Sequence, residues 1–193
     1  MKEKVSIGVS ARHVHLTKEV YEKLFEEPLT KEKDLNQIGE FASVQKLTLV
    51  NGDKEIAGVR VLGPFRSYNQ VEISKKDAMT LKVAPPVRAS GDILGASEIT
   101  LKTDKASVTL NACILAQRHV HMTPADAQRF GVIDGQKVQI KIDGERSGII
   151  DAFVKISDNA YFEAHVDTDD SNAFLLGSDS EGTLIIWVSL LGE

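Results

Sequence analysis

Two stretches of this sequence repeat one string of residues: Arg12-His13-Val14-His15 and Arg118-His119-Val120-His121. The copies lie 106 residues apart, and a threonine follows each of them two residues later, Thr17 and Thr123. Together they contain four of the five histidines. Histidine is the commonest metal ligand among side chains, and scattered surface histidines would not repeat such a string. The repeat therefore predicts metal binding by two similar β units.

Each His-x-His pair is expected to bind an ion from one face of a strand. In a strand, residues i and i+2 point to the same face about 6–7 Å apart, so His13 and His15 share a face while Val14 points to the other. Two imidazole nitrogens can then bind one ion at about 2.0–2.1 Å. His165 is a fifth candidate ligand, and five nitrogens suit two ions better than one. The alternative, histidines that pack in a barrel wall, explains a duplicated pair less well.

Composition and charge limit the class of protein. The 193 residues are 42% hydrophobic and 26% charged, as in a soluble globular chain of one large or two small domains. The net charge of −5 offers no basic field to recruit nucleic acid or an anionic membrane. No apolar run approaches the roughly 18 residues that span a bilayer, and the N-terminus has no apolar signal core. We therefore expect a cytoplasmic protein.

The single cysteine, Cys113, cannot form a disulfide within the chain. Its neighbours Ala112, Ile114 and Leu115 are apolar, so it is expected to be a small buried hydrophobic residue. A catalytic thiol is less favoured, because nothing nearby would lower its pKa.

Short strands and dense turn signals predict a mainly β fold with short α-helices. Asn51-Gly52, Asp134-Gly135 and Asp143-Gly144 are each flanked by β-rich runs, a strong hairpin signal. Such a pattern favours small β-barrels over a doubly wound sheet. Strands are expected at 47–50, 59–62, 107–110, 138–142, 152–156 and 183–188.

Three short helices are expected from their capping residues. Thr17 can cap a helix that reaches to about Phe25. Ser74 and Asp77 form a capping-box-like start for a helix over 75–81. Thr123 followed by Pro124 begins a third helix, which should end at Gly131.

Several polar residues near these motifs are ambiguous. Glu72 lies in an alternating stretch and, from the residues alone, is expected to be a surface carboxylate. Arg66 follows a Gly-Pro turn, which favours a loop that reaches into a site, and arginine suits bidentate binding of phosphate or carboxylate. Asp167 could orient a ligand imidazole, whereas Asp169 and Asp170 are expected in a solvated acidic turn.

Five strings of the chain resemble the phosphotransacylases associated with propanediol utilisation, the phosphate propanoyltransferases. The resemblance covers nearly the whole chain, from about Val5 to Trp187. Its motifs are ordered and specific. They lie at 10–15, 63–66 with 70–74, 84–92, 117–122 and 165–169.

The resemblance implies a fold, a metal content and an assembly. The fold is one phosphotransacylase unit, 1–193, of two small interleaved β-barrel domains, with repeat halves at approximately 5–85 and 86–193 on either side of Pro85-Pro86. The metal content is two zinc ions, and the assembly is a homodimer. From the ligand chemistry, cobalt, nickel or iron remain alternatives.

The same resemblance assigns residues to roles. One zinc is bound by His13, His15 and Glu72, and the other by His119, His121 and His165. Arg66 binds phosphate. Coenzyme A contacts are implied for Ser10, Arg60, His165 and Asn172. Less defined polar roles near the site fall to Gln37, Glu40, Gln70, Arg88 and Ser90. Lys155 stands where an arginine is expected, which puts a phosphate contact there in doubt.

The implied reaction converts a short-chain acyl-CoA, propanoyl or acetyl, and phosphate reversibly to acyl phosphate and CoA. The sequence shows no serine, cysteine or lysine nucleophile with an adjacent base. We therefore predict direct attack of phosphate on the thioester in a ternary complex.

Two other classes of protein are weighed against this one. A dinuclear metallohydrolase also uses His-x-His pairs, but commonly adds an acidic residue and a histidine directly downstream, where this chain has Leu16-Thr17 and Met122-Thr123. A non-catalytic barrel would use its metal only for stability. Because about four residues precede the first strand, no packaging extension and no microcompartment shell partner are expected.

Overall fold

The computed structural model describes residues 2–186, and these divide into two compact units. The central unit is Ala11–Ala116, and the terminal unit joins the first ten residues to the chain from Gln117 onward. The repeat halves predicted at 5–85 and 86–193 do not coincide with these units. Pro86 lies inside the central unit, where its carbonyl accepts a hydrogen bond from Leu115 N at 2.9 Å.

The central unit contains a closed ring of six strands. Each neighbouring pair is hydrogen-bonded, and the last strand pairs with the first. In order around the ring they are β4 (Phe41–Asn51), β5 (Lys54–Gly63), β2 (His13–His15), β6 (Gln70–Glu72), β9 (Ser107–Ala116) and β8 (Ser97–Lys102). Two further short strands add to its sides: β3 (Lys31–Asp34) pairs with β4, and β7 (Val87–Arg88) pairs with β9.

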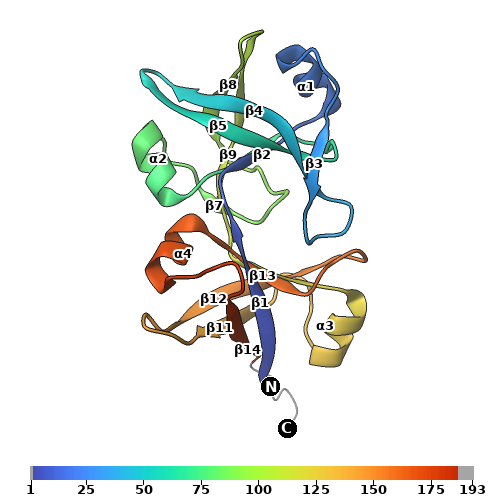
Figure 1. Ribbon diagram of the computed structural model, residues 1–193. Helices are drawn as coiled ribbons and strands as arrows, with labels where there is room; N and C mark the ends of the chain where they lie inside the picture. Colours follow the sequence, from blue (N-terminus) through green and yellow to red (C-terminus); the bar gives the residue numbers. More distant parts are fainter. Residues whose placement is uncertain (1, 187–193) are drawn as a thin grey trace. The chain divides into compact units, whose positions relative to one another are not determined.

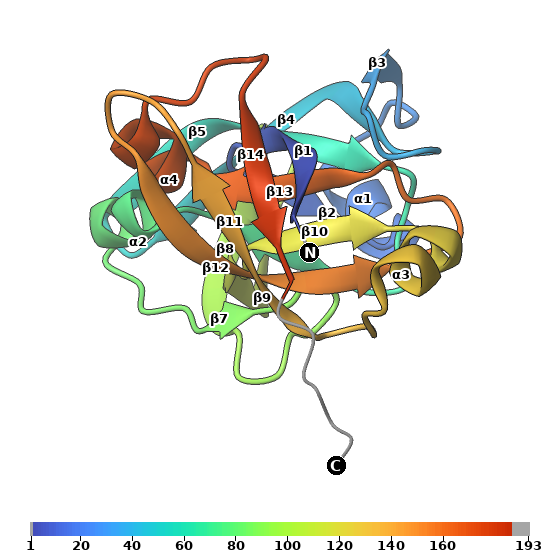
Figure 2. The same cartoon turned by 90° about the horizontal axis from the view of Figure 1, so that it is seen from below.

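The terminal unit is also a closed six-stranded barrel. The first strand of the chain completes it by lying between β13 and β14, as Figure 2 shows. The order is β1 (Lys2–Ser10), β13 (Glu163–Asp167), β10 (His119–Met122), β12 (Gly148–Ile156), β11 (Lys137–Ile142) and β14 (Glu181–Ile185). The strand predicted at 183–188 is thus present over its first residues, while Trp187 and Val188 lie outside the described residues.

The two barrels share one pattern of pairing. The His-x-His strand runs parallel to one neighbour (β2 with β5, β10 with β12) and antiparallel to the other (β2 with β6, β10 with β13). Each barrel has its own core, around Val61 and Leu101 in the central unit and around Val120 and Ile140 in the terminal unit. The predicted fold class, mainly β with two small barrels, is confirmed, and the shared pairing agrees with an internal repeat.

The three predicted helices are present. They are α1 (Lys18–Leu24), α2 (Lys75–Leu81) and α3 (Pro124–Phe130), capped by Thr17, Ser74 and Thr123 as expected. α3 ends at Gly131, whose φ of 66° suits glycine. Helices flank each barrel on opposite sides, α1 and α2 in the central unit and α3 and α4 (Thr168–Phe174) in the terminal unit (Figure 1). No helix within residues 2–186 is long and apolar enough to cross a membrane.

Two local predictions were wrong. Asp134-Gly135 does not turn a hairpin, because the residues before it form α3; its Gly135 N instead donates to Val154 O at 2.8 Å. The expected acidic turn after His165 is the beginning of a fourth helix, α4 (Thr168–Phe174), with Asp167 as its N-cap.

Truncating a core side chain should destabilise the central barrel. Leu101 on β8 is fully buried, so we expect Leu101→Ala to lower the free energy of unfolding by about 2–5 kcal/mol, because a cavity replaces its side chain. The matched control is Leu94→Ala, whose side chain is 76% exposed and whose loss should cost less than about 0.5 kcal/mol. Urea unfolding measures both, and equal losses would contradict the packing described.

Candidate metal and phosphate site

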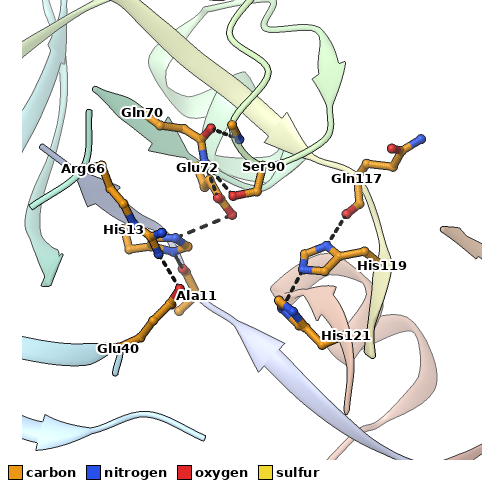
Figure 3. A network of polar contacts seen from close by, with 11 residues as sticks. Ala11, His13, Glu40, Arg66, Gln70, Glu72, Ser90, Gln117, His119 and His121 are labelled. Atoms are coloured by element: carbon orange, nitrogen blue, oxygen red, sulfur yellow. Dashed lines mark hydrogen bonds and ion pairs between the residues drawn. The ribbon is translucent and has the colours of Figure 1, made fainter. Parts of the chain in front are cut away.

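In the central barrel, His13, His15 and Glu72 come together from two antiparallel strands. His13 on β2 lies directly opposite Glu72 on β6. All three side chains are buried, and one donor atom from each lies within 4.8 Å of the others. His13 Nε2 is 3.5 Å from Glu72 Oε2 (Figure 3). Glu72 is therefore no surface carboxylate, because β6 is buried along its whole length.

The terminal barrel repeats this arrangement with a third histidine. His119 on β10 lies directly opposite His165 on β13. One donor atom from each of His119, His121 and His165 lies within 4.8 Å of the others. His119 Nε2 is 3.1 Å from His121 Nε2 (Figure 3).

Both clusters fit a zinc ion. His13 Nδ1 donates to Ala11 O and His119 Nδ1 to Gln117 O, each at 2.8 Å. Because a carbonyl can only accept, these bonds leave the Nε2 lone pairs for a metal. Tetrahedral ligands bonded at 2.0–2.1 Å are about 3.3 Å apart. The His13–Glu72 distance of 3.5 Å and the His119–His121 distance of 3.1 Å are close to this value. Two histidines with a glutamate, and three histidines, are both donor sets of catalytic zinc sites.

The electrostatics of the central cluster favour a cation. Burial alone would lower the pKa of His13. The charge of Glu72, its hydrogen bond to the ring, the Ala11 carbonyl and the charge of Glu40 together outweigh burial, so the pKa of His13 is raised. The same carboxylates would stabilise a divalent ion between these side chains.

Gln70 and Ser90, two of the polar residues expected near the site, lie around Glu72. Gln70 Nε2 is 2.6 Å from Glu72 Oε1 and 3.2 Å from Ser90 Oγ. Gln70 Oε1 accepts a hydrogen bond from Gly91 N at 2.7 Å, which fixes the direction of the amide. The loop after β7 thus orients Gln70, and Gln70 in turn orients the Glu72 carboxylate.

Arg88 and Gln37, two further polar residues expected near the site, form hydrogen bonds within their own loops. Arg88 Nε donates to Leu94 O at 2.8 Å and therefore braces the loop that contains Ser90. Gln37 is buried, and its carbonyl accepts from Glu40 N at 3.1 Å in the loop before β4.

Arg66 lies in the loop between β5 and β6, beside the central cluster. Its backbone N donates to Leu16 O at 2.9 Å, and its guanidinium pairs with Glu40 (Figure 3). Its Nε is buried and has no hydrogen-bond partner among the described residues. Glu40 is also close enough to raise the pKa of His13. The guanidinium therefore offers an N–H donor next to the cluster, which suits an anion.

Two arginine–aspartate pairs anchor the His-x-His strands, and sequence reasoning missed them. Arg12 binds Asp77 through two hydrogen bonds of 2.7 and 2.9 Å, and Arg118 binds Asp170 through two of 2.7 Å. In both pairs the hydrogen bonds to the aspartate raise the pKa of the arginine. Asp77 and Asp170 are buried, so the expectation that Asp170 lies in a solvated turn was wrong. A repeated arginine before each His-x-His was the available signal.

Comparison with known proteins gives the family. A model of the phosphate propanoyltransferase family matches residues 6–177. The phosphate propanoyltransferase of Citrobacter koseri is 42% identical over 185 residues, which cover 93% of this chain and 87% of that protein. That of Limosilactobacillus reuteri is 40% identical over 188 residues, covering 94% and 88%. This chain belongs to the phosphate propanoyltransferase family. It is accordingly an acyltransferase, as the resemblance implied.

The residues that the family resemblance assigns to coenzyme A lie on both units. Ser10 ends β1 opposite Asp167, two residues beyond His165, and Asn172 is exposed on α4. Arg60 belongs to the central unit, on β5 opposite His13, where it pairs with Glu32.

Lys155 and Glu163 both lie beside histidines of the terminal cluster. Lys155, the departure from the expected arginine, lies on β12 opposite His121. The carboxylate in contact with His165 is Glu163, with Oε2 2.8 Å from Nε2. Asp167, which was considered for that role, instead accepts from Asp170 N at 2.9 Å as the cap of α4.

Cys113 should be inert in the folded protein. It is fully buried on β9, as predicted, and burial raises the pKa of its thiol to about 12. At pH 8 the thiolate is therefore scarce as well as inaccessible, and we expect no reaction of native protein with Ellman's reagent. In urea one thiol per chain should react. Rapid labelling of the native protein would contradict the burial of Cys113.

Proposed function

We propose that this chain is a two-zinc phosphate acyltransferase that converts propanoyl-CoA or acetyl-CoA and phosphate reversibly to acyl phosphate and CoA. One zinc is bound by His13, His15 and Glu72, and the other by His119, His121 and His165. The observation that supports this most is a guanidinium, that of Arg66, beside a three-donor metal cluster in a chain of this family.

Each part of the proposed site has a separate role in the reaction. A zinc ion bound by these residues would supply Lewis acidity to polarise the acyl oxygen and stabilise a soft thiolate leaving group. Arg66 binds phosphate through its planar fork and holds one phosphate oxygen toward the acyl carbon. Ser10, Arg60, His165 and Asn172 bind coenzyme A.

Acyl transfer is proposed to occur in one covalent step. A phosphate oxygen forms the new bond to the acyl carbon, the carbon–sulfur bond breaks, and the electron pair leaves with the CoA thiolate. The proton that hydrogen phosphate loses balances the one that the thiolate takes up to give the CoA thiol. The protein supplies no nucleophile to this step. The burial and raised pKa of Cys113 support this, since they exclude its thiol as the acceptor of an acyl group.

Thiol release from propanoyl-CoA should depend on phosphate. Transfer to phosphate yields free CoA only when phosphate is present, and incubation without it should leave no acyl group on the protein. Release is measured with a thiol reagent, and the adduct by intact mass. Phosphate-independent release would indicate a hydrolase instead, and a covalent acyl-protein would refute direct attack.

Replacing Arg66 with lysine should weaken phosphate binding selectively. Lysine keeps the positive charge but lacks the planar guanidinium that donates two parallel hydrogen bonds. A hydrogen bond to a charged group contributes about 1.5–3 kcal/mol to binding. We expect Arg66→Lys to raise the KM for phosphate roughly 10–100-fold and to leave the zinc content unchanged. Arg146→Lys, in an exposed turn, is the matched control. An unchanged KM for phosphate would remove Arg66 from the proposed site.

The acyl preference and the assembly remain predictions. Turnover on acetyl-, propanoyl- and butanoyl-CoA decides the acyl preference, and analytical ultracentrifugation tests the homodimer. A cytoplasmic location is expected but rests on the sequence alone.

A further inference from the structure

The residue two positions before the third ligand contacts that ligand in both barrels. Gln70 contacts Glu72 at 2.6 Å, and Glu163 contacts His165 at 2.8 Å. Both supporting residues are also paired with the second histidine of the motif, Gln70 with His15 and Glu163 with His121. Gln70 and Glu163 therefore hold equivalent positions in the two barrels.

The two barrels differ in which of the two residues, the ligand or its supporting residue, is the carboxylate. In the central cluster the ligand Glu72 is a carboxylate, and its support Gln70 is a neutral amide. In the terminal cluster the ligand His165 is an imidazole, and its support Glu163 is a carboxylate. Each pair thus contains one carboxylate, but only in the central cluster is that carboxylate a ligand.

The fold makes room for the Glu163–His165 pair. Glu163 is buried, and Gly8 on β1 lies opposite His165. A Cβ atom at position 8 would come within 2.9 Å of Glu163 Cδ and 3.1 Å of His165 Cδ2. The equivalent neighbour of Glu72 in the central barrel is Ile114 on β9. A side chain is therefore accommodated beside Glu72, whereas the terminal barrel has only hydrogen at this point.

We propose that Glu163 is a positioning residue of the terminal cluster. It accepts the Nε2 proton of His165, which leaves the Nδ1 lone pair of that ring for the metal. This contact fixes the direction and tautomer of the ring and supplies the negative charge that the central cluster has in Glu72. Gly8 keeps the space that this contact needs. The inference rests on the proposed metal at His119, His121 and His165.

The expected size of the effect follows from the way such contacts act. A carboxylate that accepts a proton from a ligand imidazole makes the ring a better donor, and losing such a partner typically costs 10–100-fold in metal affinity. Glu163→Gln keeps an acceptor but removes the charge, whereas Glu163→Leu removes both. The leucine variant should therefore lose more affinity than the glutamine variant.

The test measures zinc affinity by chelator competition on the full chain. Wild type should bind two equivalents. In Glu163→Gln one equivalent should weaken about 10-fold, and in Glu163→Leu up to about 100-fold, while the other is unchanged. Glu145→Gln, an exposed glutamate of the same unit, is the matched control and should bind as wild type does.

Gly8→Ala provides a second variant that leaves every polar group in place. Crowding of Glu163 and His165 should weaken the same equivalent of zinc, and thermal unfolding of the metal-free protein checks that the barrel still forms. Cobalt substitution adds a spectroscopic readout: the visible bands should shift in these variants without a change in coordination number.

The outcomes separate this inference from the proposed function. A wild-type chain that binds no zinc at these histidines refutes the proposed metal sites. Two equivalents in wild type with unchanged affinity in Glu163→Leu refute the role of Glu163 alone. A lower coordination number of cobalt in Glu163→Gln would make Glu163 a ligand and would also overturn its positioning role.

Discussion

The structure depends on the register of one antiparallel strand pair in each barrel. That register places the first histidine of each motif opposite the third ligand, His13 opposite Glu72 and His119 opposite His165. Directly opposite residues in such a pair have Cα atoms about 4.5–5.5 Å apart and point to the same face. A slip of one residue would turn the third ligand to the other face and leave two histidines alone.

The arginine–aspartate pairs hold this register. Arg12 precedes the first histidine of its strand, and Asp77 lies five residues after the third ligand, in the first turn of α2. Arg118 and Asp170 repeat the arrangement with α4. Each bidentate pair therefore ties the beginning of one ligand strand to the helix that follows the other. Because the aspartates are buried, removing an arginine would leave an uncompensated charge.

Local signals in the sequence predicted the local structure well. Helices α1, α2 and α3 follow from a capping residue and a short amphipathic run, and the shared face of His13 and His15 follows from strand geometry. α4 was missed, because Asp, Ser and Asn are poor helix formers, although Asp167 as N-cap was a usable signal.

Long-range features could not be read in the same way. The burial of Glu72 depends on a strand of three residues and on its pairing with β2, which no local pattern encodes. The β1 strand joins the terminal barrel across more than a hundred residues of chain, so sequence order gives no indication of it. Only the family resemblance assigned Glu72 as a ligand, on the basis of its motif.

Formal charges show why net charge alone cannot select phosphate. In the central unit, Glu72 and Glu40 contribute two negative charges and Arg66 one positive charge, which leaves one negative charge around the cluster. With a divalent ion, the central cluster would have a formal charge of only +1. Selectivity for phosphate must then come from the geometry of the Arg66 guanidinium, whose N–H groups match the spacing of phosphate oxygens, and not from a strong positive field.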